Sequence, residues 1–136
     1  MSDIVADLRT HLLTQSGVTN EVGTRIYFDH LPQGAVYPAI ILEQNDLRLI
    51  RKLDDKQTLR RAQIDVQNVA ESHTGVRTLQ AAVQAAIEFE TGTWGSTTVR
   101  RAYIDDEFDG TWSPQDGSEL HIRVAFTTVN VWFVDA

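Results

Sequence analysis

An acidic segment near the C-terminal end of the sequence comes closest to a known ion-binding pattern. Counted from Asp105, acids stand at positions one, three, five and twelve and a glycine stands at position six; the acids are Asp105, Glu107, Asp109 and Asp116. This is the spacing of oxygen ligands in a calcium loop of the EF-hand type. The match is imperfect, because Glu stands at position three, Asp stands at position twelve, and Pro114 interrupts the loop. The flanking segments also indicate strands, not the helices of that motif. A solvated acidic hairpin loop is the favoured interpretation, and a calcium site is the weaker alternative.

The histidines give no clear route to catalysis or metal binding, because they are scattered along the chain at His11, His30, His73 and His121. The sequence has no Walker A loop, dinucleotide glycine fingerprint, Gly-x-Ser-x-Gly elbow or His-Glu-x-x-His motif. Cysteine is absent, which excludes disulfides, thiolate catalysis and cysteine-based zinc sites. We therefore expect no enzymatic activity and no cofactor, and we expect the histidines to be partly exposed structural residues.

Charge is concentrated in two blocks of opposite sign. Residues 46–61 hold six of the twelve basic residues, namely Arg48, Arg51, Lys52, Lys56, Arg60 and Arg61. Residues 105–119 contain no Lys or Arg and hold the acids Asp105, Asp106, Glu107, Asp109, Asp116 and Glu119. The net charge of the chain is −7. This balance disfavours sequence-independent binding to phosphates, so DNA passing nearby would slide past rather than be held.

The three tryptophans stand in different settings. Trp112 lies among acids in the predicted loop, where stacking on bases is disfavoured because such platforms combine aromatic residues with Lys and Arg. An exposed Trp112 is better suited to a protein partner. We expect Trp94 and Trp132 to lie in the core or on a face of a sheet.

The length and hydrophobicity of the chain suit one compact domain covering residues 1–136. Hydrophobic residues make up 42% of the sequence, which is enough for a single core. The N-terminus carries acids where a secretory signal would carry basic residues. No apolar run approaches the roughly 20 residues that a membrane span needs. We expect a soluble, unprocessed protein that is made in a reducing cytoplasm.

Hydrophobic periodicity predicts two helices and several strands. Asp3 would cap a helix from Ile4 to about Ser16, Gly17 would end it, and a polar linker, residues 18–24, would follow. An alanine-rich helix is predicted from Thr74 to about Glu90. The strands are predicted at residues 25–28, 38–43, 47–53, 58–69, 97–104 and 119–133, with a turn at 54–56 that makes a long hairpin. This order favours an α+β fold with a mainly antiparallel sheet and both helices on one face.

Two strands show patterns that the structure can test. Ala62, Ile64 and Val66 alternate with polar residues, which is typical of a half-buried antiparallel strand. In the last strand the apolar positions change phase between Phe126 and Val129. A β-bulge near residues 127–128 would account for that change.

Several segments together resemble the phage tail completion family, whose members finish the tail and join it to the head. They are the N-terminal helix, Gly23-Thr24-Arg25-Ile26-Tyr27, Pro32-Gln33-Gly34, Tyr37-Pro38-Ala39-Ile40-Ile41-Leu42, Ala62-Gln63-Ile64-Asp65-Val66-Gln67, the alanine-rich helix, and Leu120-His121-Ile122-Arg123-Val124-Ala125-Phe126. The resemblance covers almost the whole chain, and residues 23–42 are its most specific part. No catalytic residues carry over from it.

The resemblance implies a homo-hexameric ring at the head-proximal end of the tail. Such a ring would stack on the last ring of tail tube protein, stop tube growth and present a surface to the head connector or stopper. DNA would pass through the ring without sequence-specific binding. Gene transfer agents use similar parts, so the particle need not be an infectious phage. A head completion or stopper protein of the neck is the main alternative, and a calcium-dependent binding module is a weaker one.

Opposite charges offer one way to hold such a ring together, because each subunit must present two different patches to its neighbours. The first patch would comprise Arg48, Arg51, Lys52, Arg60 and Arg61. The second would comprise Asp105, Asp106, Glu107, Asp109 and Trp112. Contact between the two patches, either on a neighbouring subunit of the ring or on a stacked partner, would set register and orientation more than affinity. The alternative is that both patches are ordinary solvated surface, since exposed ion pairs contribute little.

Overall fold

The computed structural model describes residues 3–50, 59–112 and 122–135, and their main elements are three helices and six strands. The helices are α1 (Ile4–Leu13), α2 (Ser16–Val22) and α3 (His73–Ile87). The strands are β1 (Ile26–Phe28), β2 (Ala39–Ile50), β3 (Leu59–Ala70), β4 (Gly92–Trp94), β5 (Thr97–Trp112) and β6 (Ile122–Asp135). None of the helices in these residues has the length and hydropathy that crossing a membrane requires.

All six strands form one sheet in the order β1-β2-β3-β6-β5-β4. Neighbours are antiparallel, except that the short β1 runs parallel to β2. β2 and β3 pair from Ala39–Val69 to Ile50–Leu59, which confirms the predicted long hairpin; its turn at residues 54–56 lies outside the described residues. β2 unites the two strands predicted at 38–43 and 47–53, with a register shift between Gln44 and Asp46. The α+β class is therefore confirmed.

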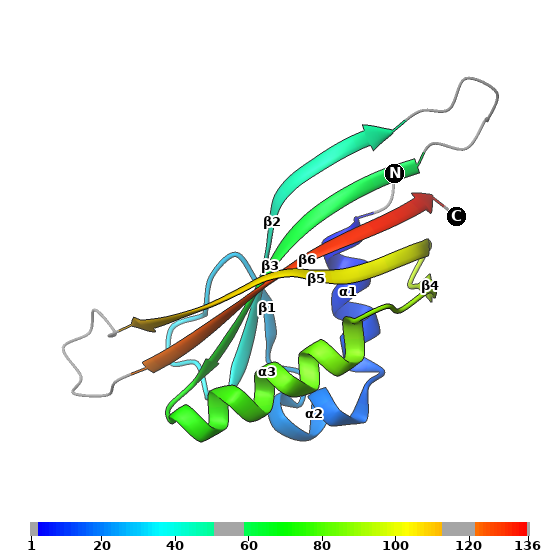
Figure 1. The fold of residues 1–136 in the computed structure, drawn as a ribbon. Coiled ribbons are helices and arrows are strands. Elements are labelled where there is room, and N and C mark those ends of the chain that lie inside the picture. The colour runs from blue at the N-terminus through cyan, green and yellow to red at the C-terminus, as the bar shows by residue number, and fades with distance from the viewer. Residues whose placement is uncertain (1–2, 51–58, 113–121, 136) are drawn as a thin grey trace.

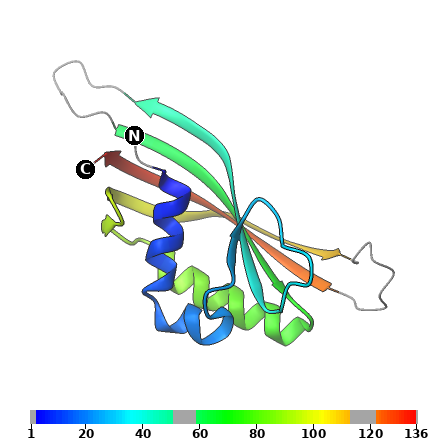
Figure 2. The same ribbon diagram turned by 180° about the vertical axis from the view of Figure 1, so that it is seen from behind.

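The three helices lie on one side of the strongly twisted sheet, as the two opposite views show (Figures 1 and 2). The main core is enclosed between the helices and this face of the sheet. It includes Leu8 and Leu12 of α1, Leu79 and Val83 of α3, and Ile64 of β3, none of which is exposed. Burying an aliphatic side chain of this size contributes about 1.5–3 kcal/mol, so this one layer dominates the stability.

The alternation predicted for β3 is confirmed. Ala62, Ile64 and Val66 are fully buried against the helices, whereas Gln63 and the other polar residues between them are half-buried on the opposite face. We call the face that carries Gln63 the outer face, and the other the helix face. Side chains of paired strands at the same register share a face, so the strand registers assign the paired residues of the four long strands to one face or the other.

The predicted bulge at residues 127–128 is wrong. β6 pairs with β3 without interruption from Arg123 to Val134. The hydrophobic phase changes because different faces of β6 are covered at its two ends. Val129 and Phe133 point to the helix face and its core, whereas Val124 joins a second cluster on the outer face that includes Leu31 and Tyr37 from the β1–β2 connection. The hydrophobic positions of a regular strand can thus change phase when one of its ends is covered on one face and the other end on the opposite face.

The N-terminal region differs from its prediction. The first helix ends at Leu13, and Gly17 lies inside α2, where a polar linker was expected. Val18 and Val22 of α2 are one turn apart and fully buried. The stop lies at Gly23, which has a φ of 59°, a conformation that favours glycine. The described residues therefore contain three helices, where two were predicted.

Polar contacts fasten α1 to the far end of the sheet. Asp7 is 8% exposed, and its carboxylate accepts hydrogen bonds from the hydroxyls of Thr97 and Ser96. His11 is also buried, so the expectation of partial exposure is wrong for this residue. Its ring stacks on Trp94 with centroids 4.4 Å apart, and its Nε2 lies 2.8 Å from the carbonyl oxygen of Ala86 on α3. Trp94 itself is a core residue, as predicted.

Candidate functional site

The predicted basic patch lies on β2 and β3, toward the end of the hairpin. Arg48 pairs with Arg61 across the two strands, and the register continues to Trp132 and Arg101, so these four residues form one row across the outer face. The guanidinium of Arg61 lies 5.9 Å from the centre of the Trp132 ring, a cation–π contact. Trp132 is therefore a sheet-face residue, as predicted. Asp46 lies 2.9 Å from the Nε of Arg48 and 3.7 Å from Arg61, so it neutralises part of the row.

One other described member of the predicted basic patch does not share this surface. Arg60 pairs with Leu49 and Phe133, so it lies on the helix face and is half-buried. Arg51 and Lys52 lie outside the described residues. Arg48 and Arg61 are thus the predicted basic residues that the structure places together on the outer face.

The predicted acidic patch lies mostly on a strand. The expected strand 97–104 continues as β5 to Trp112, so Asp105 to Asp109 are strand residues and the prediction of a loop is wrong there. A register shift between Ile104 and Asp106 marks a bulge at Asp105. Charged residues are common on strands at the edge of a sheet, where they discourage pairing with other chains.

The acids of β5 point to both sides of the sheet. Glu107 and Asp109 lie on the helix face, where Gln84 and Arg77 of α3 bond to them. The carboxylate of Asp105 accepts a hydrogen bond of 3.4 Å from Gln63, which lies on the outer face. The side chain of Trp112 falls outside what the structure describes.

This arrangement does not match a calcium loop. A strand cannot wrap its acids around one ion, and the three described ligand candidates, Asp105, Glu107 and Asp109, are divided between the two faces. Among the described residues no group of three or more His, Asp or Glu side chains is placed to hold a metal ion. The fourth candidate, Asp116, lies outside those residues.

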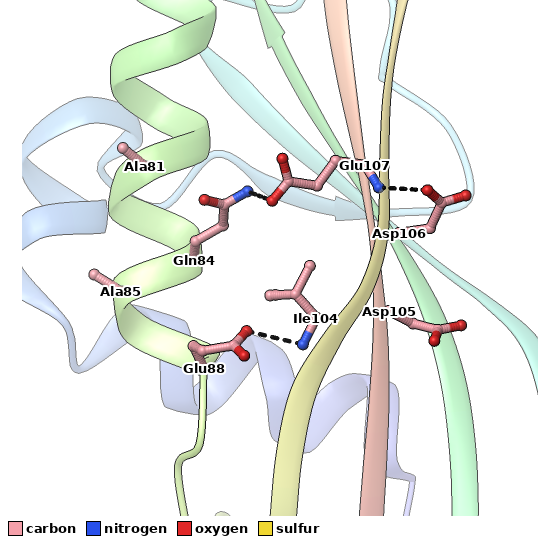
Figure 3. A pocket seen from close by; sticks show the side chains of 8 residues that line it. All are labelled: Ala81, Gln84, Ala85, Glu88, Ile104, Asp105, Asp106 and Glu107. Atoms are coloured by element: carbon pink, nitrogen blue, oxygen red, sulfur yellow. Dashed lines mark hydrogen bonds between the residues drawn. The ribbon is translucent and has the colours of Figure 1, made fainter.

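A groove separates the acidic part of β5 from α3 (Figure 3). Its volume is about 730 Å³, and it is lined by Ala81, Gln84, Ala85 and Glu88 of α3 and by Ile104, Asp105, Asp106 and Glu107 of β5. Gln84 and Glu88 reach from the helix toward the strand, where Glu88 accepts a hydrogen bond of 2.9 Å from the backbone N–H of Ile104. Ala81 and Ala85 are exposed, so the helix side of the groove has small apolar residues between polar ones.

Both long outer strands of the sheet have an open edge. β1 pairs with β2 only from Ile40 to Leu42, so residues 43–50 have no strand on that side within the described structure. β4 pairs with β5 only up to Val99, and the segment after α3 bonds to the backbone of Ala102. No described strand pairs with residues 105–112 on that side. Open edges present free backbone donors and acceptors to another chain.

Exposed hydrophobic side chains accompany the two edges, and the sequence interpretation did not single them out. Leu47 and Leu49 on β2 are 41% and 49% exposed. Phe89, beside Ala102 of β5, is 68% exposed. Alternation of Leu with Arg over 47–49 was the available signal for β2. The sequence predicted an alanine-rich helix but no groove beside it.

The two predicted patches do not meet within one chain. Arg48 lies at one edge of the sheet and the acids of β5 lie at the other, with β3 and β6 between them. Arg48 and the acids of β5 thus lie on different strands of one sheet, and each of these strands has a stretch that no described strand pairs on its outer side.

Comparison with known proteins assigns the family. The model of the family described as "Tail completion protein gp17" matches residues 6–129, so the chain belongs to this family and is a structural protein of the tail of a phage or related particle. No curated protein sequence matches the chain. A chain from the solved structure "Virion of native gene transfer agent (GTA) particle" has a similar fold, with a TM-score of 0.63 and 13% identity over 98% of this chain and 99% of that one.

Proposed function

We propose that the protein is a ring subunit that ends the tail tube and joins the tail to the head, as a homo-hexamer at the head-proximal end of the tail. The match of residues 6–129 to the tail completion family is the observation that carries this proposal. The fold shared with a chain of a gene transfer agent virion is consistent with it. A closed ring needs two different patches on each subunit, and the stretches of β2 and β5 that no described strand pairs lie on opposite sides of the sheet.

The partners of this ring would be the tail tube protein on one side and the head connector or stopper on the other. DNA would pass through the ring on its way between head and tail. The net charge of −7 suits passage, because an acidic wall repels phosphates and offers no counterion-releasing contacts.

Deletion of the gene tests the proposal, with negative-stain microscopy of the particles as the measurement. Overlong tubes, or tails separated from full heads, are expected, and restoration of the gene on a plasmid should return joined particles. Normal joined particles from the deletion strain would refute a role in the neck.

The same experiment, followed by a binding assay, separates tail termination from the stopper role. A terminator should bind purified tail tubes, whereas a stopper should bind complexes of portal and adaptor proteins. The family description as a tail completion protein favours binding to tubes. Binding to portal complexes alone would replace termination with the stopper function.

A further inference from the structure

We propose that the groove between α3 and β5 binds an extended, basic segment of another protein of the particle, and that this segment lies along the edge of β5. The partner is identified by its chemistry, which is a strand-like backbone that carries Lys or Arg side chains. This inference rests on the proposed neck function, because a neck protein must bind at least one other protein of the particle.

The edge of β5 already holds an extended partner up to the point where the groove begins. In the segment after α3, the N–H of Phe89 donates to the carbonyl oxygen of Ala102, whose own N–H donates to the carbonyl oxygen of Glu90. Two residues further along the same edge, the N–H of Ile104 donates to the carboxylate of Glu88. Outward backbone groups recur at every second residue of an antiparallel strand, so a partner segment can continue this pairing where the groove lies (Figure 3).

The helix side of the groove is a stripe of side chains that the sheet does not cover. Its members are spaced by three or four residues, so they lie on one side of the helix: Ala81, Gln84, Ala85 and Glu88. The neighbouring stripe of α3, which includes Leu79 and Val83, is buried. Ala81 and Ala85 are exposed, and their small side chains leave space beside Ile104 for the aliphatic part of a Lys or Arg side chain.

Charge gives the groove a preference for a basic segment. Its lining includes four acids and no Lys or Arg; the acids are Glu88, Asp105, Asp106 and Glu107. Their described contacts are with uncharged groups, namely the backbone N–H groups of Ile104 and Glu107 and the side-chain amides of Gln63 and Gln84. Carboxylates gathered in one groove repel each other and attract cations. Lys or Arg side chains of a partner would neutralise them, whereas an acidic segment would add to the repulsion.

A different protein, and not a second copy, fits this requirement. The open part of β2 is the other long strand edge that the structure describes, and it is not uniformly basic. Arg48 on this edge forms an ion pair with Asp46, and Glu43 lies on the same strand. A second copy that offered this edge would bring further acids to an acidic groove.

Peptide binding to the full-length protein tests the groove directly. The probe is a short synthetic peptide in which Lys alternates with Thr, and its uncharged counterpart has Gln in place of every Lys. Backbone amide shifts in NMR spectra of the protein locate the binding surface. The Lys peptide should shift the amides of residues 81–88 and 104–107 most, and the Gln peptide should bind about ten-fold more weakly because several ion pairs are lost.

A variant that fills the groove supplies the second measurement. Ala85→Arg puts a large cation into the groove at an exposed helix position, where arginine is well tolerated. It should lower the affinity for the Lys peptide about ten-fold, because it removes space and repels the peptide. The matched control is Asn20→Arg, which adds the same charge at an exposed position of α2 outside the groove, and it should bind almost as the natural protein does. Circular dichroism checks that both variants are folded.

Several outcomes would overturn the proposal. They are no binding of the Lys peptide, equal binding of the Gln peptide, shifts spread over the surface and not centred on the groove, and an equal loss of affinity in the two variants. Shifts of the same amides that depend on protein concentration without any peptide would assign the groove to a second copy, and would overturn the assignment to another protein.

Complementation of the deletion strain separates this inference from the proposed function. A plasmid copy with Ala85→Arg should leave heads and tails unjoined, whereas Asn20→Arg should restore joined particles. Joined particles with Ala85→Arg would overturn binding in the groove, and the neck function would stand if the strain without a plasmid is defective. Normal particles from that strain would count against the function itself.

Discussion

At the scale of single residues, Asp7 is a polar side chain that holds α1 against the start of β5. Its buried carboxylate accepts from Thr97 and Ser96, and it lies against Gly95, whose φ of 56° brings the turn close to the helix. A hydrogen bond to a charged group contributes about 1.5–3 kcal/mol, and an unpaired buried donor adds a cost.

We therefore predict that Asp7→Ala lowers the free energy of unfolding by about 2–3 kcal/mol, measured by urea denaturation. Asp7→Asn keeps an acceptor and should lose less. Glu43→Ala, an exposed change, should stay within about 0.5 kcal/mol of the natural protein. Equal stability of Asp7→Ala and Glu43→Ala would show that this contact does not hold α1.

At the scale of elements, α3 begins at a well-defined cap. The hydroxyl of Ser72 accepts a hydrogen bond of 3.0 Å from the backbone N–H of Gly75. Ser72→Ala should destabilise the protein by about 1 kcal/mol, because one of the free N–H groups of the first turn loses its partner. Thermal unfolding followed by circular dichroism measures this. Ser72→Asp can cap equally well, so a matching loss in that variant would point to a cause other than capping.

The elements also show what the sequence could and could not predict. β3 was found because its alternation follows directly from burial on one face. α2 was missed because Gly17 suggests a helix end, although Val18 and Val22, spaced by one turn, were a usable signal. The end of β5 was missed because its charges show no alternation, and an edge strand beside a polar helix needs none. The parallel pairing of β1 with β2 depends on tertiary contacts that have no local signal.

The candidate site was also predicted only in part. Composition predicted two charged patches, and the structure puts Arg48 and Asp105 at opposite edges of one sheet. The groove could not be predicted, because it is formed by α3 and β5 and depends on which alanines remain uncovered. Arg60 shows a further limit: it looks like Arg61 in the sequence, but the strand period turns it to the helix face.

At the scale of the whole molecule, charge reversal should affect assembly more than stability. Arg48→Glu is the cleaner choice, because Arg48 is exposed, whereas Arg60 is half-buried and Arg61 packs on Trp132. An exposed ion pair contributes under about 1 kcal/mol, so we expect the affinity between neighbouring subunits to fall several-fold. Quantitative blotting of purified particles would show reduced incorporation of the variant.

Compensation then identifies the partner of Arg48. Adding Asp105→Arg and Asp106→Arg to Arg48→Glu should restore part of the incorporation, and the acidic-patch reversal alone should be as defective as Arg48→Glu. High salt should reduce the differences in incorporation between the variants and the natural protein, because exposed charges are screened. No defect in Arg48→Glu, or no recovery in the combined variant, would show that these charges do not contribute to contact between subunits.

The uninterrupted pairing of β3 with β6 has a mechanical consequence. All twelve residues of β3 are paired in register with β6, while the bulges fall on the outer strands β2 and β5. A force along these two central strands loads their hydrogen bonds together in shear, whereas a force across the sheet opens them one at a time. The domain should thus be stiffest along the strands, and tension in that direction should be borne by its middle while the bulged margins bend.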